Sequence, residues 1–266
     1  MPRPISALTI AGSDSGGGAG IQADLKTFAA HGVHGLSAIA ALTAQHTRGV
    51  TAVHVPPVEF LRAQVDACFE DFEVGAVKLG MLASAGVIHA VADALQAHQP
   101  PHVVLDPVMV ATSGARLLEA DALDALRTRL LPMATVLTPN TPEAELLLGH
   151  GIADGAAADE AVQSLRALGA GAVLLKGGHL DEGDTVVDRY ADGTTTTHWQ
   201  QARMAVDGHG TGCTLASAIA ANLCLGRTPV DACGAAIGYV HDALLRGYAP
   251  GRGEVRVLDH FGARRP

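Results

Sequence analysis

Short apolar runs of strand length alternate with longer amphipathic stretches of helix length along almost the whole of this 266-residue chain. The pattern begins with an apolar run at residues 5–11 and a helical stretch at 21–30, and it still holds at residues 172–175. Alternating strands and helices favour an α/β architecture with a mostly parallel sheet and helices on both faces. No Pro/Ser-rich linker or run of charge divides the sequence, so we predict a single domain over residues 1–266.

The elements follow from hydrophobic periodicity and from the turn residues between the runs. Near the end of the chain, two short runs separated by Ala-Asp-Gly predict a β-hairpin. Residues after 250 are expected to form a surface tail. The predicted strands are 5–11, 35–43, 74–79, 102–106, 134–137 and 172–175, with the hairpin at 185–190 and 194–199; the predicted helices are 21–30, 60–72, 85–98, 119–131, a short one ending at 148, 157–168, 215–225 and 230–248.

The composition excludes several classes of function. A net charge of −9 without a Lys/Arg cluster argues against nucleic-acid binding. The first apolar run meets Gly12-Ser13-Asp14 almost at once, which predicts a strand and not a signal peptide, and no run is long enough to span a bilayer. The four cysteines have no metal-ligand spacing and suit a reducing compartment, so we predict a cytoplasmic protein.

The stretch His209-Gly210-Thr211-Gly212-Cys213 carries the strongest chemical signal. It precedes an apolar helix, and a helix that begins on Gly-Thr-Gly offers free backbone N–H groups and the positive end of its dipole to an anion. Cys213 falls in the first turn, where we expect its pKa to be lowered from about 8.5. The plainer interpretation is a glycine-rich turn in front of a core helix, with Cys213 as a small buried apolar residue.

Polar side chains gather where the predicted strands end. Because the carboxyl ends of parallel strands meet at one edge of a sheet, ligands bind there. Asp106 and Glu143 are suited to hold Mg²⁺, and Lys176 with the amides of Gly210–Cys213 is suited to neutralise a transferring phosphate. Taken singly, each residue has a structural explanation, such as a turn or a helix start; together they predict phosphoryl transfer, with Cys213 taking the proton of the acceptor hydroxyl. The strand-end residues are Gly12, Asp14, Gln45, Gly80, Met81, Asp106, Asn140, Glu143 and Lys176.

Asp24 lies at the edge of the apolar stripe of helix 21–30, one turn from the loop Gly12–Gly20. A carboxylate there is expected to be paired or to face a ligand. The loop itself has neither the Gly-Lys-Ser/Thr ending of a Walker A loop nor the spacing of a dinucleotide fingerprint. A dinucleotide-dependent oxidoreductase is therefore set aside.

A set of motifs in chain order resembles the hydroxymethylpyrimidine/phosphomethylpyrimidine kinases of thiamine biosynthesis, in the ribokinase-like superfamily. The resemblance covers about residues 7–225. It implies a three-layer α/β/α ribokinase-like fold and a homodimer. It also implies two successive ATP-dependent phosphorylations of 4-amino-5-hydroxymethyl-2-methylpyrimidine, to the monophosphate and then the diphosphate. The motifs are Gly12-Ser-Asp-Ser-Gly-Gly-Gly-Ala-Gly-Ile-Gln-Ala-Asp-Leu-Lys26, Ala41-Leu-Thr-Ala-Gln45, Lys78-Leu-Gly-Met-Leu82, Asp106-Pro-Val-Met-Val110, Thr138-Pro-Asn-Thr-Pro-Glu-Ala144, Lys176-Gly-Gly-His179 and His209-Gly-Thr-Gly-Cys-Thr214.

The resemblance also assigns roles. It places Gln45 and Asp24 at the aminopyrimidine edge, with the backbone of Gly12 beside them and Met81 over the ring. It assigns Mg-ATP to Asn140, Glu143 and Lys176. Thr211 and Gly212 are assigned to the phosphate from the helix start itself. Cys213 stands where many relatives in the wider superfamily carry an aspartate base.

The sequence departs from the family pattern at Thr112, often lysine in relatives, at His46, often asparagine, and at residues 206–208. Loss of the lysine removes a phosphate-facing cation but leaves the reaction class intact. Two alternatives stay open. One is a pyridoxine or pyridoxal kinase of the same superfamily. The other is a non-catalytic pyrimidine-binding module, against which the retained Gly-Thr-Gly-Cys turn and Lys176 argue.

Overall fold

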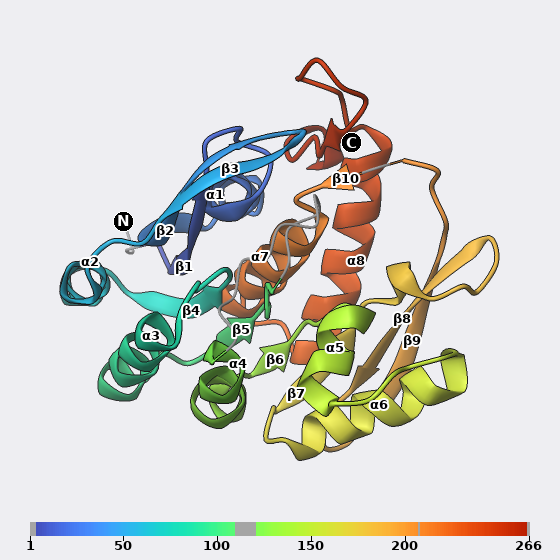
Figure 1. Ribbon diagram of the computed structural model, residues 1–266, viewed down its shortest axis with the longest axis horizontal. Coiled ribbons are helices and arrows are strands. Elements are labelled where there is room, and N and C mark those ends of the chain that lie inside the picture. Colours follow the sequence, from blue (N-terminus) through green and yellow to red (C-terminus); the bar gives the residue numbers. More distant parts are fainter. Residues whose placement is uncertain (1–3, 110–120, 207, 265–266) are drawn as a thin grey trace.

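A computed structural model describes residues 4–109, 121–206 and 208–264. Nine strands form one sheet, in the order β3-β2-β1-β4-β5-β6-β7-β8-β9, and two further strands form a small separate ladder (Figure 1). The strands are β1 Ser6–Asp14, β2 His34–His46, β3 Gly49–His54, β4 Val74–Leu79, β5 Val103–Leu105, β6 Val136–Leu137, β7 Ala172–Leu175, β8 Thr185–Ala191, β9 Thr196–Ala202, β10 Gly208–His209 and β11 Arg256–Val257.

The helices cover both faces of the sheet. The core side chains of α2 to α6 form one cluster with one face, whereas those of α1, α7 and α8 pack on the other. Neighbouring residues of a strand point to opposite faces, so Leu8 of β1 joins the first cluster and Ala7 the second. The helices are α1 Gly20–Ala30, α2 Val58–Asp71, α3 Ala85–His98, α4 Ala122–Ala125, α5 Thr141–Leu148, α6 Gly155–Ala167, α7 Thr211–Cys224 and α8 Pro229–Leu245.

Strands β1, β2, β4, β5, β6 and β7 run parallel, and both edges of the sheet are antiparallel. The chain moves outward from β1 to β2 and then returns to place β4 on the other side of β1. Such a reversal opens a crevice at the carboxyl ends of the flanking strands, where ligands bind in open α/β sheets. The sheet therefore positions a site at the ends of β1 and β4.

The predicted α/β class and parallel sheet are confirmed. The strand β3, which pairs with β2, was missed, because its residues are half-buried or exposed and give no core pattern. The helix predicted at 119–131 is a short α4 that continues as a π-helical turn at Leu126–Leu130 and a 3-10 turn at Leu131–Met133; its first two residues lie outside the described part of the chain.

The surface tail predicted after residue 250 is wrong. Strand β11 returns to pair with β10, directly before the first turn of α7. Leu258 and His260 behind it are buried. The ring Nε2 of His260 lies 3.1 Å from the hydroxyl of Thr214 in α7, and the hydroxyl of Tyr239 donates to the His260 carbonyl at 2.8 Å. The end of the chain thus holds the start of α7.

His260 should make stability depend on pH. Burial lowers its pKa to about 4, with the charge of Lys26 acting in the same direction and Asp259 opposing it. The unfolded chain takes up a proton near pH 6.5 that the folded chain refuses, so the free energy of unfolding falls as the pH drops from 6.5 to 4. Relative to His260→Asn, the wild type should lose roughly 1.4 kcal/mol per pH unit in this window, measured by urea unfolding. The control His150→Asn, at an exposed position, should keep the wild-type slope; equal slopes for all three proteins would contradict the assignment.

Candidate active site

A cluster of opposite charges, Asp106, Glu143 and Lys176, lies where β5, β6 and β7 end. The ammonium of Lys176 donates to the Asp106 carboxylate at 3.1 Å and lies 3.8 Å from that of Glu143. A Cβ on Gly212 would lie 3.2 Å from the Lys176 Nζ and 3.6 Å from an Asp106 oxygen. The first turn of α7 therefore sits directly against this cluster.

Asn140 and Glu143 also form the start of α5. The Asn140 side chain accepts from the Glu143 N–H at 2.9 Å, and Glu143 accepts from the Asn140 N–H at 2.8 Å, which is a capping box. Burial raises the pKa of Glu143 to about 7, against the lowering effect of Lys176. For Lys176 burial lowers the pKa, but the two carboxylates outweigh it and raise the pKa above its usual value. Lys176 thus keeps its charge at neutral pH.

Cys213 holds its proton more tightly than predicted. Burial raises its pKa to about 11; Lys78 lowers it, whereas Asp24 and Asp106 raise it further. The expectation that the helix start lowers this pKa is wrong, because the dipole of one helix does not outweigh loss of water together with two nearby carboxylates. The thiol of the free protein is protonated at neutral pH.

The two glycine-rich segments of the sequence pack against each other. A Cβ on Gly210, whose φ is +87°, would lie 2.0 Å from the Gly18 carbonyl oxygen, and one on Gly20 would lie 2.3 Å from that of Gly12. Only glycine permits these approaches. Asp14 fixes the first loop by accepting the N–H groups of Gly16, Gly18 and Ala19.

The residues assigned to the substrate lie at this same end of the sheet. Gly12 touches Met81, since a Cβ added to it would be 3.0 Å from the Met81 sulfur. Met81 forms a small apolar cluster with Ala41 of β2 and Ala83. Gln45 follows on β2 and lies beside His209, with 3.3 Å between the two Nε2 atoms.

Asp24 is paired, but in the core and not at the surface. It is fully buried and accepts hydrogen bonds from Thr9, Ser217 and the ammonium of Lys78, the last at 2.9 and 3.0 Å. In this structure the carboxylate meets protein groups on all sides, so its assignment to the substrate stays a prediction. Lys78 and Ser217 were missed by sequence reasoning, although a lysine inside an apolar strand is a signal for a buried partner.

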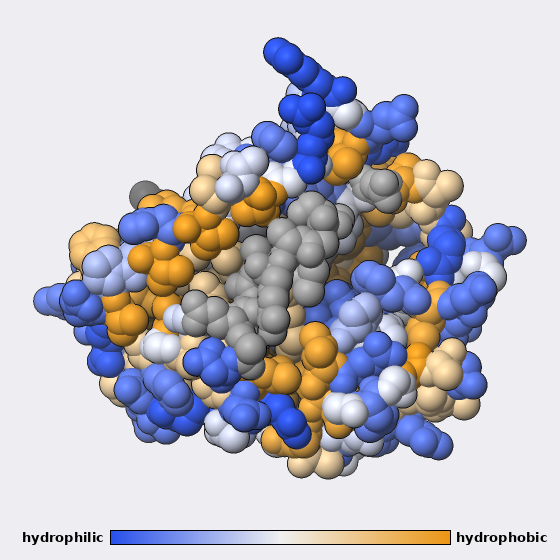
Figure 2. Space-filling view, viewed as in Figure 1, coloured by the Kyte–Doolittle hydropathy of each residue, from blue (hydrophilic) through white to orange (hydrophobic). Residues whose placement is uncertain are grey.

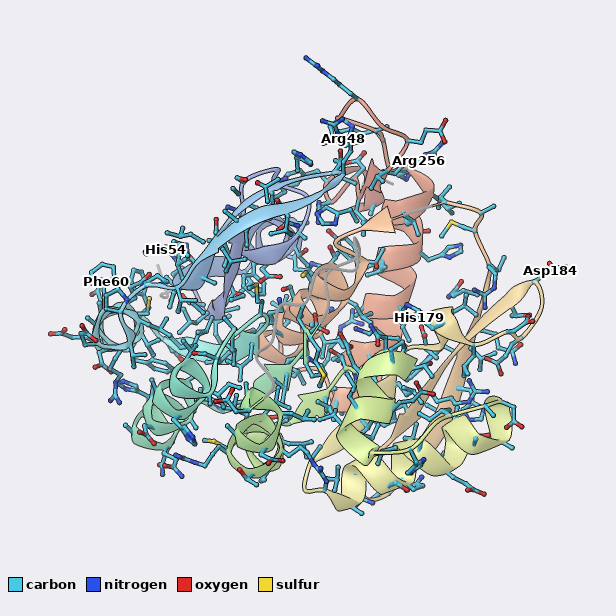
Figure 3. The ribbon with its side chains drawn as sticks, viewed as in Figure 1. Arg48, His54, Phe60, His179, Asp184 and Arg256 are labelled. Atoms are coloured by element: carbon cyan, nitrogen blue, oxygen red, sulfur yellow. The ribbon has the colours of Figure 1, made fainter. Side chains whose placement is uncertain are left out.

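The structure describes only some of the residues at which the sequence departs from the family pattern. His46 is exposed, and its Nδ1 accepts from the Arg48 N–H at 3.1 Å. Thr112 and Asp207 lie outside the described residues. His179, on the turn Gly177–His179 after Lys176 (Figure 3), has its pKa lowered by burial and by the charge of Lys176.

The donor set fits Mg²⁺, since Asp106 and Glu143 supply hard oxygen ligands on either side of the Lys176 ammonium. Among the described residues, no three His, Cys, Asp or Glu side chains gather closely enough to hold a metal ion by themselves. Mg²⁺ commonly takes one or two carboxylates and completes its shell with water and phosphate oxygens. Two carboxylates are therefore sufficient.

The fold and the site together define a ribokinase-like kinase that acts on small molecules. The family described as phosphomethylpyrimidine kinase matches residues 14–258, and the chain belongs to this family. The hydroxymethylpyrimidine/phosphomethylpyrimidine kinase of Rhizobium meliloti is 51% identical over 240 residues, 90% of each chain. The phosphomethylpyrimidine kinase structure from Clostridium difficile has 40% identity and a TM-score of 0.81, covering 90% of this chain and 99% of that one. The pyridoxal kinase of Staphylococcus aureus in complex with AMP-PCP and pyridoxal has 31% identity and a TM-score of 0.90, covering 99% and 96%. The family and the fold predicted from the sequence are confirmed.

The raised pKa of Cys213 should be visible in its alkylation. The rate constant for iodoacetamide, followed by mass analysis of the peptide that contains Cys213, should rise with unit slope in log rate from pH 7 to pH 10, because only the thiolate reacts. Cys213→Ser identifies the signal, and Cys68, partly buried and with its pKa also raised, is an internal reference. A plateau below pH 8 would instead show a thiolate stabilised by the helix start.

Proposed function

We propose that this protein transfers the γ-phosphoryl group of ATP to the hydroxymethyl group of 4-amino-5-hydroxymethyl-2-methylpyrimidine, and then a second phosphoryl group to the monophosphate. The observation that carries the proposal is the Asp106–Lys176 pair against the Gly212 turn, in a member of this kinase family. We further propose that residues 1–266 form one kinase domain around the nine-stranded sheet.

In the proposed reaction the chain acts chiefly by positioning charge. The acceptor hydroxyl lies near Cys213, with Met81 and Gln45 holding the ring. Lys176 and the N–H groups at the start of α7 stabilise the negative charge of the transferring group. Asp106 and Glu143 would hold Mg²⁺, which neutralises phosphate charge when bound. Asn140 and Thr211 are the further residues proposed to bind ATP.

In the proposed reaction Cys213 accepts the hydroxyl proton late, and only in its thiolate form, after the thiol has lost its own proton to water; this form is a small fraction at neutral pH. Phosphoryl transfer passes through a loose transition state in which the attacking hydroxyl keeps its proton until bond formation is advanced. Such a reaction needs little help from a strong base. The raised pKa of Cys213 is therefore compatible with transfer that depends on electrostatic stabilisation.

Mass analysis of products after incubation with Mg-ATP and the pyrimidine should show the monophosphate and then the diphosphate. Lys176→Met should lower kcat by at least about 100-fold, the scale of losing one stabilising charge of a transition state. Arg129→Met, which removes a surface ion pair with Asp93, is the matched control and should keep wild-type turnover. No product from the wild type would refute the proposal.

A second candidate is pyridoxal kinase activity, favoured by the 0.90 TM-score to the Staphylococcus aureus enzyme. Pyridoxine also presents a ring hydroxymethyl group. Pyridoxine is tested as a substrate in the same product assay as the pyrimidine. If only pyridoxine gives a monophosphate, pyridoxal kinase activity replaces the first assignment.

We also propose a homodimer formed through an apolar patch on β2, β3 and α2. Leu42, Val53, Val58 and Phe60 are between 37% and 60% exposed. Apolar side chains gather over these elements in Figure 2, and His54 and Phe60 lie on the same side of the molecule in Figure 3. Within the described residues, strand β3 is also an edge of the sheet, so its outer backbone groups have no neighbouring strand there. A second copy would cover both features.

Light scattering coupled to size exclusion should give the mass of a dimer for the wild type. Val53→Asp should weaken association at least about tenfold, because an unpaired carboxylate would be buried. Leu225→Asp, at an apolar position 51% exposed at the far end of α7, should leave the dimer intact. A wild-type monomer, or equal loss in both variants, would contradict the assignment of this patch.

None of the described helices has the length and apolar character needed to cross a membrane. We propose a cytoplasmic location on the basis of the four free cysteines, Cys68, Cys213, Cys224 and Cys233.

A further inference from the structure

Gln45 is held from several sides at the carboxyl end of β2. Its backbone N–H donates to the Ser15 hydroxyl at 2.8 Å, and its carbonyl accepts from that hydroxyl at 2.7 Å. Its side-chain amide lies between the Thr43 hydroxyl, at 3.0 Å, and the ring of His209. With the backbone fixed, the remaining freedom of Gln45 is which end of the amide faces which neighbour.

The hydrogen bonds of Thr43 determine the orientation of the Gln45 amide. The Thr43 hydroxyl lies 2.8 Å from the Ser13 carbonyl, which can only accept, so the single hydroxyl proton points there. Toward Gln45, Thr43 can then only accept. The amide must therefore turn its NH₂ group toward Thr43, which exchanges the positions of its oxygen, 3.0 Å from the Thr43 hydroxyl, and its nitrogen, 3.3 Å from Nε2 of His209.

The protonation of His209 independently requires the same orientation of the Gln45 amide. Nε2 of His209 lies 3.0 Å from an oxygen of Asp14, a buried carboxylate that can only accept, so Nε2 carries a proton; Asp14 and the Gln45 amide, 3.3 Å away, share it in a three-centre hydrogen bond. This proton is present whether the ring is neutral or charged. The Gln45 atom that faces Nε2 must consequently be the acceptor, which is the amide oxygen.

The imidazole has no room to turn away. A Cβ on Gly18 would lie 2.7 Å from Cδ2 of His209, so the ring lies flush on the first glycine loop. Both His209 and Asp14 are buried. Although burial raises the pKa of Asp14, the hydrogen bonds from His209, Ala19 and Gly16 lower it more, so this carboxylate stays ionised.

We infer that His209, held by Asp14, is a positioning residue that fixes the amide of Gln45 with its oxygen toward His209 and its NH₂ toward Thr43, and that it thereby sets specificity for a ring bearing an amine next to a ring nitrogen. The inference depends on the proposed function, because it takes Gln45 as a ligand of the substrate. A fixed amide offers one acceptor and one N–H side by side. An amine beside a ring nitrogen is the complement of that pair, as when glutamine or asparagine reads adenine.

The test is a cycle of two substrates and five variants. The substrates are 4-amino-5-hydroxymethyl-2-methylpyrimidine and the same ring with hydrogen in place of the amine. The preference is the ratio of their kcat/KM values. The variants are His209→Met, which keeps volume without a donor; His209→Gln, which carries a donor near the position of Nε2; Gln45→Ala; the double variant Gln45→Ala with His209→Met; and the control His46→Met, an exposed neighbour of Gln45.

His209→Met should lower the preference roughly threefold to tenfold, the value of one hydrogen bond, mainly through KM of the amino substrate. His209→Gln should keep the preference within about twofold of wild type, and His46→Met should not change it. In the Gln45→Ala background, His209→Met should have no further effect on the preference.

The outcomes separate this inference from the proposed function. No phosphorylation of the pyrimidine by the wild type would overturn the function itself. If the wild type is active and Gln45→Ala lowers the preference, but His209→Met lowers kcat/KM equally for both substrates, then His209 only supports the loops and the inference is wrong. An additive effect of the two changes in the double variant would also overturn it.

Discussion

The buried ion pair of Lys78 and Asp24 fixes the elements that surround the site. Asp24 lies on α1, Lys78 on β4, and the two further donors, Thr9 and Ser217, lie on β1 and α7. Either charge alone would cost several kcal/mol in the core, so the pair forms only when these four elements are in register. Burial lowers the pKa of Lys78, but Asp24, Cys213 and Asp106 together raise it more, and the lysine stays charged. The pair lies below the crevice between β1 and β4.

The glycine-rich loops depend on that arrangement. Ser217 is one turn beyond Cys213 on α7, so the bond from Ser217 to Asp24 sets how the first turn of α7 faces α1. With both helices fixed, the two loops meet at Gly18 and Gly210 without room for a side chain. The C-terminal strand β11 then closes over them, because Val257 pairs with His209 and would collide with any Cβ on Gly18. The Lys78–Asp24 pair in the core thus sets how the two glycine-rich loops meet at the edge of the sheet.

Much of the fold, and the gathering of several candidate site residues at one edge of the sheet, could be predicted from the sequence. Strands such as β4 and β7 are apolar throughout and short, and Asp106, Asn140 and Lys176 follow strand ends that a parallel sheet must bring together. Strand β3 and β11 could not be predicted in this way, since an exposed edge strand and a two-residue ladder carry no periodic pattern. His209 was part of a recognised motif, but its partner Asp14 is 195 residues away, and only the folded chain shows that they touch.

The ionisation of Cys213 was predicted in the wrong direction because two effects compete there. The favourable effect of a helix start is worth about 0.3–1 kcal/mol, less than the 1.4 kcal/mol that corresponds to one pKa unit. Loss of water and the charges of Asp24 and Asp106 act against it, and Lys78, already neutralised by Asp24, offsets only part of them. A sequence shows the helix start but not the depth of burial or the carboxylates that the fold brings near. For the proposed reaction, the same balance assigns most of the stabilisation of a transferring phosphate to Lys176 and the α7 amides, since these are the positive groups that lie beside Asp106 in the part of the chain that the structure describes.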